Sequence, residues 1–140
     1  MSHTIRPFTE ADTSAVVDLW KLCDLTRPWN DPTKDITRKL TVQPELFLLA
    51  EQEGRIIGSV MAGYEGHRGW INYLAVHPDH RRAGLGRQLM AAAEKHLLSL
   101  GCPKINLQVR TSNTAAIGFY QSIGFAQDEV VSYGKRLIPD

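Results

Sequence analysis

The chain has 140 residues and a mass of 15.7 kDa, which predicts one domain over residues 1–140 rather than two. Hydrophobic residues make up 43% and charged residues 22%, a globular balance that argues against a disordered, collagen-like or coiled-coil chain. The formal net charge of +1 supplies no overall field for binding a polyanion, so we expect no nucleic-acid partner.

The apolar runs of the chain are short, as in Leu46–Ala50. They fall far below the roughly 18 residues that a membrane-spanning helix needs, so we expect no membrane partner. The first residues, Met1–Thr9, have no apolar core of a secretory signal. We therefore expect a cytoplasmic protein.

The first third of the chain predicts two helices. Thr9 and Asp12 have the spacing of a capping box at a helix start. Apolar residues then recur with a helical period, at Ala15, Val16, Leu19, Trp20 and Cys23. Asp31 before Pro32 predicts the start of a second, short helix through Leu40, preceded by a loop over Thr26–Asp31.

The middle of the chain predicts three strands. Leu46–Ala50 and Arg55–Gly63 are apolar runs on either side of Gly54, which suits a tight antiparallel turn. Trp70–Val76 is rich in β-branched and aromatic residues and is stopped by His77-Pro78. These segments predict an antiparallel meander.

The last third predicts helix, strand, helix and strand in turn. A long amphipathic helix is predicted from Gly84 to Leu100, and Ile105–Val109 alternates as a strand does. Asn113 begins a short helix that Gly124 ends, and Val130–Leu137 is the last predicted strand. The order predicts an α/β fold with a mixed, mostly antiparallel sheet flanked by helices.

The turn between the third strand and the long helix carries the main functional signal. It reads His80-Arg81-Arg82-Ala83-Gly84-Leu85-Gly86-Arg87. Glycines at a helix N-terminus let backbone N–H groups converge on an anion, and the arginines add positive charge. A glycine-rich turn with solvated arginines is the alternative. The residues fit neither the Rossmann nor the P-loop pattern.

Two motifs resemble those of the GNAT acyltransferase superfamily. Arg81-Arg82-Ala83-Gly84-Leu85-Gly86, after Leu74-Ala75-Val76-His77-Pro78, is similar to its motif A. The segment 113–125 is similar to the family pattern Asn-x-x-Ala-x-x-x-Tyr-x-x-x-Gly-Phe. The resemblance covers most of the chain and implies a single N-acetyltransferase domain with the GNAT fold. Arg27–Pro32 and Gly66–Gly69 resemble the small bacterial YpeA-like branch.

The resemblance implies acetyl-CoA as cosubstrate. It places the pyrophosphate on backbone amides of Arg82–Arg87 and the pantetheine arm along the third strand. Asn113 is implied to contact the cofactor, although an Asn there is equally a helix cap. The implied cofactor-binding residues are Leu74, Ala75, Val76, Arg81, Arg82, Ala83, Gly84, Leu85, Gly86, Arg87 and Asn113.

The resemblance also implies catalytic residues. Tyr120 is implied to protonate the leaving thiolate, with packing in the core as the alternative. Gln108 stands where some family members have a Glu base, and an amide cannot act as a base. By chemistry alone Glu65 and His67 are the replacements, and Glu65 is the expected base. Asp31 and His77 are weaker candidates, all of them could be solvated loop residues, and a water chain without a dedicated base is equally compatible.

The expected acceptor-binding residues are Trp29 and Asn30, because a Trp between prolines offers a rigid flat wall. The acceptor is an amine, either a small molecule or a peptide, bound by a monomer or a homodimer. Cys23 and Cys102 are expected as buried thiols, with no disulfide, metal site or covalent acyl intermediate. The leading hypothesis is an N-acetyltransferase acting by direct amine attack on the thioester. An acyl-CoA sensor without turnover, which Gln108 favours, is the alternative, and a local arginine cluster gives weak support to a nucleic-acid module.

Overall fold

The structure is a computed structural model that describes residues 2–140. It divides into two compact units, the first up to Leu107 and the second from Gln108 to Asp140. The first unit contains the whole sheet and three α-helices. Each unit is described by itself.

The first unit is built on a five-stranded sheet in the order β1-β2-β3-β4-β5. The strands are β1 Thr4–Pro7, β2 Phe47–Gln52, β3 Arg55–Tyr64, β4 Gly69–Val76 and β5 Ile105–Leu107. Strands β1 to β4 pair antiparallel, and β5 pairs parallel to β4. The predicted mixed, mostly antiparallel sheet is confirmed.

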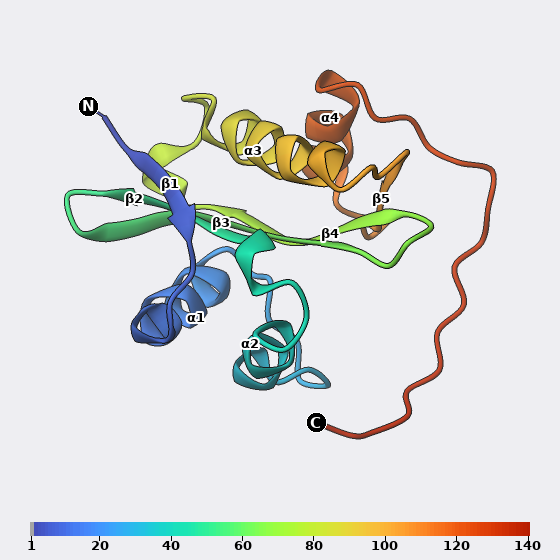
Figure 1. The fold of residues 1–140 in the computed structure, drawn as a ribbon, viewed down its shortest axis with the longest axis horizontal. Coiled ribbons are helices and arrows are strands. Elements are labelled where there is room, and N and C mark those ends of the chain that lie inside the picture. The colour runs from blue at the N-terminus through green and yellow to red at the C-terminus, as the bar shows by residue number, and fades with distance from the viewer. Residues whose placement is uncertain (1) are drawn as a thin grey trace. The chain divides into compact units, whose positions relative to one another are not determined.

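Helices cover both faces of this sheet (Figure 1). Helices α1 (Thr13–Leu22) and α2 (Pro32–Lys39) lie on one face, and α3 (Leu85–Ser99) lies on the other. The predicted period is confirmed at Val16, Leu19 and Trp20 of α1 and at Leu89 and Leu97 of α3, which are buried. Two residues of the predicted α1 stripe are not buried, since Ala15 is exposed and Cys23 is partly exposed. The longest helix among residues 2–140, α3, has 15 residues, and none in that range is long and apolar enough to cross a bilayer.

The predicted elements of the first unit agree with the structure to within two residues at most ends, and one strand was not predicted. Strand β1 was not predicted, because four residues ending in a proline give no period to detect. Strand β5 stops at Leu107, two residues before the predicted end at Val109. A three-residue strand has only its pairing with β4 to define it.

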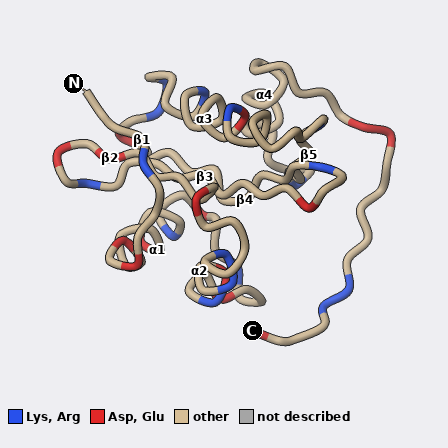
Figure 2. Tube along the Cα trace, in the orientation of Figure 1, with Lys and Arg blue, Asp and Glu red and all other residues tan. Residues whose placement is uncertain are grey.

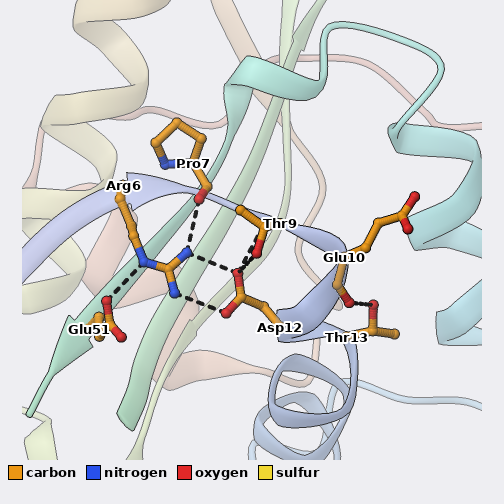
Figure 3. Close-up of polar contacts among 7 residues, drawn as sticks. All are labelled: Arg6, Pro7, Thr9, Glu10, Asp12, Thr13 and Glu51. Atoms are coloured by element: carbon orange, nitrogen blue, oxygen red, sulfur yellow. Dashed lines mark hydrogen bonds and ion pairs between the residues drawn. The ribbon is translucent and has the colours of Figure 1, made fainter. Parts of the chain in front are cut away.

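The predicted helix start at Thr9 and Asp12 is a side-chain cluster that also ties in two strands (Figure 3). The Asp12 carboxylate accepts hydrogen bonds from the Thr9 backbone N–H at 2.8 Å and hydroxyl at 3.0 Å. Arg6 of β1 donates to both Asp12 oxygens at 2.9 Å and to Glu51 of β2 at 2.9 Å. Chiefly through the Arg6 bond, the pKa of Asp12 falls to about 2, and that of Arg6 is raised.

Strand β4 contains a bulge next to the predicted cofactor strand. Ser59 pairs with Ala75 and Met61 pairs with Asn72, so two residues of β4 lie opposite one of β3. One of the two, Tyr73, has φ +52°, which is uncommon for a residue other than glycine. The Ser59 hydroxyl donates to the Tyr73 carbonyl at 2.8 Å, and Trp20 Nε1 donates to Ser59 at 2.9 Å. The fully buried Ser59 thus holds the bulged backbone.

The second unit contains helix α4 (Thr114–Ser122) and a segment over residues 126–140 without regular structure. Asn113 caps α4, as predicted, by accepting from the Ala116 N–H at 3.1 Å. The predicted strand Val130–Leu137 is wrong, because the described chain has no strand after Leu107. Its apolar residues are exposed, including Val131 at 76% and Tyr133 at 93%, so β-propensity without a pairing partner does not form a strand.

Candidate active site

The turn before α3 has the backbone shape that its glycines predict. Gly84 is the N-cap of α3 with φ +81°, and nothing lies within 4 Å of the position where its Cβ would be. The described backbone bonds of α3 begin with the Gln88 N–H donating to the Gly84 carbonyl at 3.0 Å. The preceding amides of Leu85 and Gly86 belong to the first turn, where a helix has no internal acceptors to offer. This turn can therefore receive an anion.

Arginines surround the same turn. Residues 81–84 and Arg87 are exposed, and Arg82 has φ +66°, a second left-handed residue beside Gly84. Arg81 folds back, and its Nε donates to the Val76 carbonyl at 3.0 Å. That bond joins the turn to the end of β4. Positive side chains and a helix N-terminus act together here, which is the electrostatic arrangement that phosphate groups require.

The expected pantetheine strand lies beside this turn in the same unit. Leu74, Ala75 and Val76 form the end of β4, and Leu74 is the second residue of the bulge. Ala75 is buried, while Leu74 and Val76 are partly exposed. The Cys23 thiol lies 3.4 Å from the Val76 carbonyl, and Cys102 is buried. The first unit thus brings together the strand and the turn that were predicted to bind the two ends of one cofactor.

Asn113 precedes α4 and Tyr120 lies on that helix, both in the second unit. Asn113 is the N-cap described above, so one of its two alternative roles is observed. The Tyr120 ring packs edge-on against Phe119 at 5.2 Å and Phe125 at 5.6 Å between centroids. Burial raises the pKa of Tyr120 to about 12, so its phenol keeps its proton at neutral pH.

The candidate bases differ in the hydrogen bonds that their side chains make. The exposed Glu65 carboxylate accepts from the backbone N–H groups of His67 and Arg68, both at 2.5 Å. The Arg68 and then the His67 bonds lower the pKa of Glu65, which makes it a weaker proton acceptor. Gln108 donates to the Ser132 hydroxyl within the second unit.

The weaker base candidates have structural roles. The Asp31 carboxylate caps α2 by accepting from the Thr33 hydroxyl at 2.6 Å and its N–H at 2.9 Å, and these bonds lower its pKa. The His77 ring accepts from the Asp79 N–H at 3.1 Å.

The expected acceptor residues lie in the turn before α2. Trp29 is 52% exposed, and the Asn30 N–H donates to the Arg27 carbonyl at 3.1 Å. Basic residues gather on the helix that follows this turn (Figure 2). The turn therefore presents a large aromatic surface at the start of α2.

A further polar pair in this region was missed by the sequence analysis. The Tyr73 hydroxyl donates to Asp35 Oδ2 at 2.6 Å, which joins the bulge of β4 to α2. The residues are 38 positions apart, and Tyr73 lies inside a segment that indicates only a core strand. A charged residue facing the sheet from a short helix was the only local signal.

Comparison with known proteins places this arrangement in a family. The model of the acetyltransferase (GNAT) family matches residues 14–125. Acetyltransferases of Pectobacterium atrosepticum and Yersinia enterocolitica are each 52% identical over 136 residues, covering 97% of this chain and 96% of theirs.

Solved structures of acetyltransferases have the same fold. AAC(6')-Iy in complex with the bisubstrate analogue CoA-S-monomethyl-acetylneamine has a TM-score of 0.79 at 21% identity, over 98% of this chain and 100% of that one. The ribosomal-protein-S18-alanine N-acetyltransferase of Escherichia coli has a TM-score of 0.75 at 27% identity, over 91% and 79%. The chain therefore belongs to the acetyltransferase (GNAT) family, and its relatives identify it as an acetyltransferase enzyme.

Proposed function

We propose that this enzyme transfers the acetyl group of acetyl-CoA to a primary amine by direct attack of the amine on the thioester. The proposal rests on one observation. The turn at Gly84 and the end of β4, which are the two elements predicted to bind acetyl-CoA, are joined in one unit. The left-handed turn at Gly84 opens α3, and Arg81 ties that turn to the end of β4. A phosphate at the turn and an extended arm along β4 would occupy one continuous path.

The residues present fit the donor at both ends. The arginines and the first-turn amides of α3 suit a pyrophosphate, and no side chain occupies the space above Gly84. The backbone of Leu74 to Val76 would bond the pantetheine amides as an added strand does. When bound, acetyl-CoA supplies the activated acyl carbon.

We assign the proton for the departing thiolate to Tyr120. Its phenol stays protonated at neutral pH, as the acid form must. We propose direct attack and no covalent acyl intermediate, because the Cys23 thiol is engaged at 3.4 Å with the Val76 carbonyl and Cys102 is buried.

We assign the acceptor to the turn that contains Trp29 and Asn30. Trp29 offers exposed aromatic area, and the enzyme would use it as a wall for the amine substrate. Removal of this wall by Trp29→Ala should raise the KM for the amine and leave the KM for acetyl-CoA unchanged. Glu65 is the base that the sequence predicts, but its carboxylate is a weakened proton acceptor because its pKa is lowered.

The decisive experiment measures CoA release from acetyl-CoA with a panel of primary amines. The panel should contain aminoglycosides and peptides with an N-terminal alanine, since proteins of similar fold are named for those substrates. It should also contain lysine peptides and simple diamines. We expect an amine that accelerates CoA release at least tenfold over water and a product with an N-acetyl group.

A second readout separates binding from turnover. Acetyl-CoA should raise the Tm, because a ligand at about a hundredfold excess over its Kd stabilises a fold by about 2.7 kcal/mol. A Tm shift without CoA release from any amine would instead identify an acyl-CoA sensor. No shift at all would refute the donor site. We further propose a place in the YpeA-like branch and a cytoplasmic location, on the motifs and composition given above.

A further inference from the structure

The bulge in β4 changes which face of the sheet the strand presents. A Cβ added at Gly69 would lie 2.8 Å from Cys102 Sγ and 3.2 Å from Leu97 of α3, so position 69 faces α3. Tyr73 and Ala75 instead pack with the cluster that contains Trp20 of α1. In a regular strand these three odd-numbered residues would share one face. The bulge therefore turns Tyr73 toward α1 and α2.

Three contacts fix Tyr73 in this unusual position. Its ring stacks on Trp20 at 3.8 Å between centroids, its carbonyl accepts from Ser59, and its hydroxyl donates to Asp35. A left-handed backbone in a non-glycine residue is strained and persists only where its surroundings impose it. Here the strain serves to hold a phenol against a carboxylate, one residue before the predicted cofactor strand.

Asp35 keeps the capacity to bind a further group. Its second oxygen lies 3.3 Å from the Arg38 guanidinium, and its side chain is 26% exposed. A carboxylate has about four acceptor sites, and the contacts with Tyr73 and Arg38 use two of them. These two are the polar groups described around it, one from β4 and one from its own helix. An N–H from solution can reach such a carboxylate.

We propose that Asp35 is the general base for the acceptor amine and that Tyr73 is its positioning residue. The proposal rests on the proposed function. As the amine nitrogen bonds to the acyl carbon it becomes cationic, and Asp35 takes one of its protons. The C–S bond then breaks, its electron pair stays on sulfur, and Tyr120 supplies the thiol proton. Solvent afterwards removes the proton from Asp35 and restores that of Tyr120.

Asp35→Asn is the main test, because an amide can still accept the Tyr73 hydrogen bond but cannot take a proton at neutral pH. We expect kcat with the best amine of the panel to fall about 10²- to 10⁴-fold. The decline of kcat/KM toward low pH, which is the acidic limb of its pH profile, should also be lost. The acetyl-CoA-induced Tm shift should stay. Asp35→Glu should restore the limb and part of the rate, which a purely structural role would not do.

Tyr73→Phe tests the positioning role. Loss of the phenol removes the partner that Asp35 has on β4, so kcat should fall while the KM for the amine and the acetyl-CoA-induced Tm shift stay unchanged. Asp18→Asn is the matched control, since it makes the same change at an exposed position of α1 and should leave the profile unaltered. Glu65→Gln is measured beside it and should also keep the limb.

Four outcomes would overturn the proposal. The first is an Asp35→Asn enzyme within threefold of the wild-type kcat, and the second is loss of the limb in Glu65→Gln alone. The third is a protein that shows the acetyl-CoA Tm shift but releases no CoA to any amine or to water, which removes the proposed function as well. If Asp35→Asn lowers the Tm and abolishes the acetyl-CoA shift while Asp35→Glu does not restore the limb, the pair is structural.

Discussion

Asp12 links local helix capping to stability in acid. Its folded pKa of about 2 lies below the ordinary value of 3.8, chiefly because Arg6 bonds to the charged form. A lowered folded pKa stabilises the fold above the unfolded pKa, and this contribution is lost as the pH falls from about 4 toward 2. One pKa unit is about 1.4 kcal/mol, so the shift corresponds to about 2 kcal/mol of stability. The Asp12 side chain is only 12% exposed, so water screens this interaction little.

We therefore predict that Asp12→Asn lowers the free energy of unfolding at pH 7 by about 2 kcal/mol and by little at pH 2. Urea unfolding at both pH values measures the difference. Asp18→Asn serves as the control, because Asp18 is exposed on α1 and makes none of these contacts. An Asp12→Asn protein with equal losses of stability at pH 7 and pH 2 would show that the ion pair does not carry the effect.

A substitution at Tyr120 can remove the phenol proton and keep the aromatic ring. Tyr120→Phe keeps the edge-on packing with Phe119 and Phe125, so the Tm should change little. We expect kcat to fall about 10²- to 10⁴-fold with an unchanged Kd for acetyl-CoA. Tyr133→Phe, at a 93% exposed position, should leave turnover at the wild-type value. A loss of turnover below threefold in Tyr120→Phe would assign the thiolate proton to water.

At the scale of elements, the start of α3 can be tested with one added charge. Gly86→Glu places a carboxylate in the first turn, where it favours the helix but repels a phosphate. We expect a folded protein in which acetyl-CoA no longer raises the Tm. Ala91→Glu adds the same charge at an exposed position of the same helix and should keep the shift. A full shift in Gly86→Glu would place the pyrophosphate elsewhere.

The helices of this protein are predictable because their signals are local. Asp31 with Pro32 and Asn113 each give a cap that the structure contains, and the apolar period of α1 and α3 gives the buried face. The bulge at Tyr73 is different, because it depends on Ser59 and Trp20, which are distant in sequence. The motif around Gly84 predicts the left-handed turn that opens α3, whereas the pair of Asp35 and Tyr73 exists only through pairing of distant elements.

At the scale of the molecule, the core lies in the first unit. The buried hydrophobic residues described in 2–140 run no further than Cys102, and the apolar residues after 126 are exposed. The residues Val130–Leu137 predict a strand, but apolar content alone does not reveal whether a segment finds a pairing partner. Burial, and not residue type, therefore decides how much each leucine contributes to the free energy of unfolding.

A pair of identical substitutions tests this distribution. Leu49→Ala at a fully buried position should lower the free energy of unfolding by about 2–5 kcal/mol. Leu137→Ala at an 84% exposed position should change it by less than about 0.5 kcal/mol. Urea unfolding gives both values. A large loss for Leu137→Ala would mean that the C-terminal segment is packed in solution.

The three tryptophans are an intrinsic fluorescence probe, because their side chains differ in exposure to solvent. Trp20 is fully buried and stacked on Tyr73, while Trp70 is 36% and Trp29 52% exposed. Acrylamide should therefore quench Trp29 emission first and Trp20 emission last. An amine that binds against Trp29 would shield it from the quencher. A fluorescence titration of the Trp70→Phe protein would therefore detect acceptor binding without turnover.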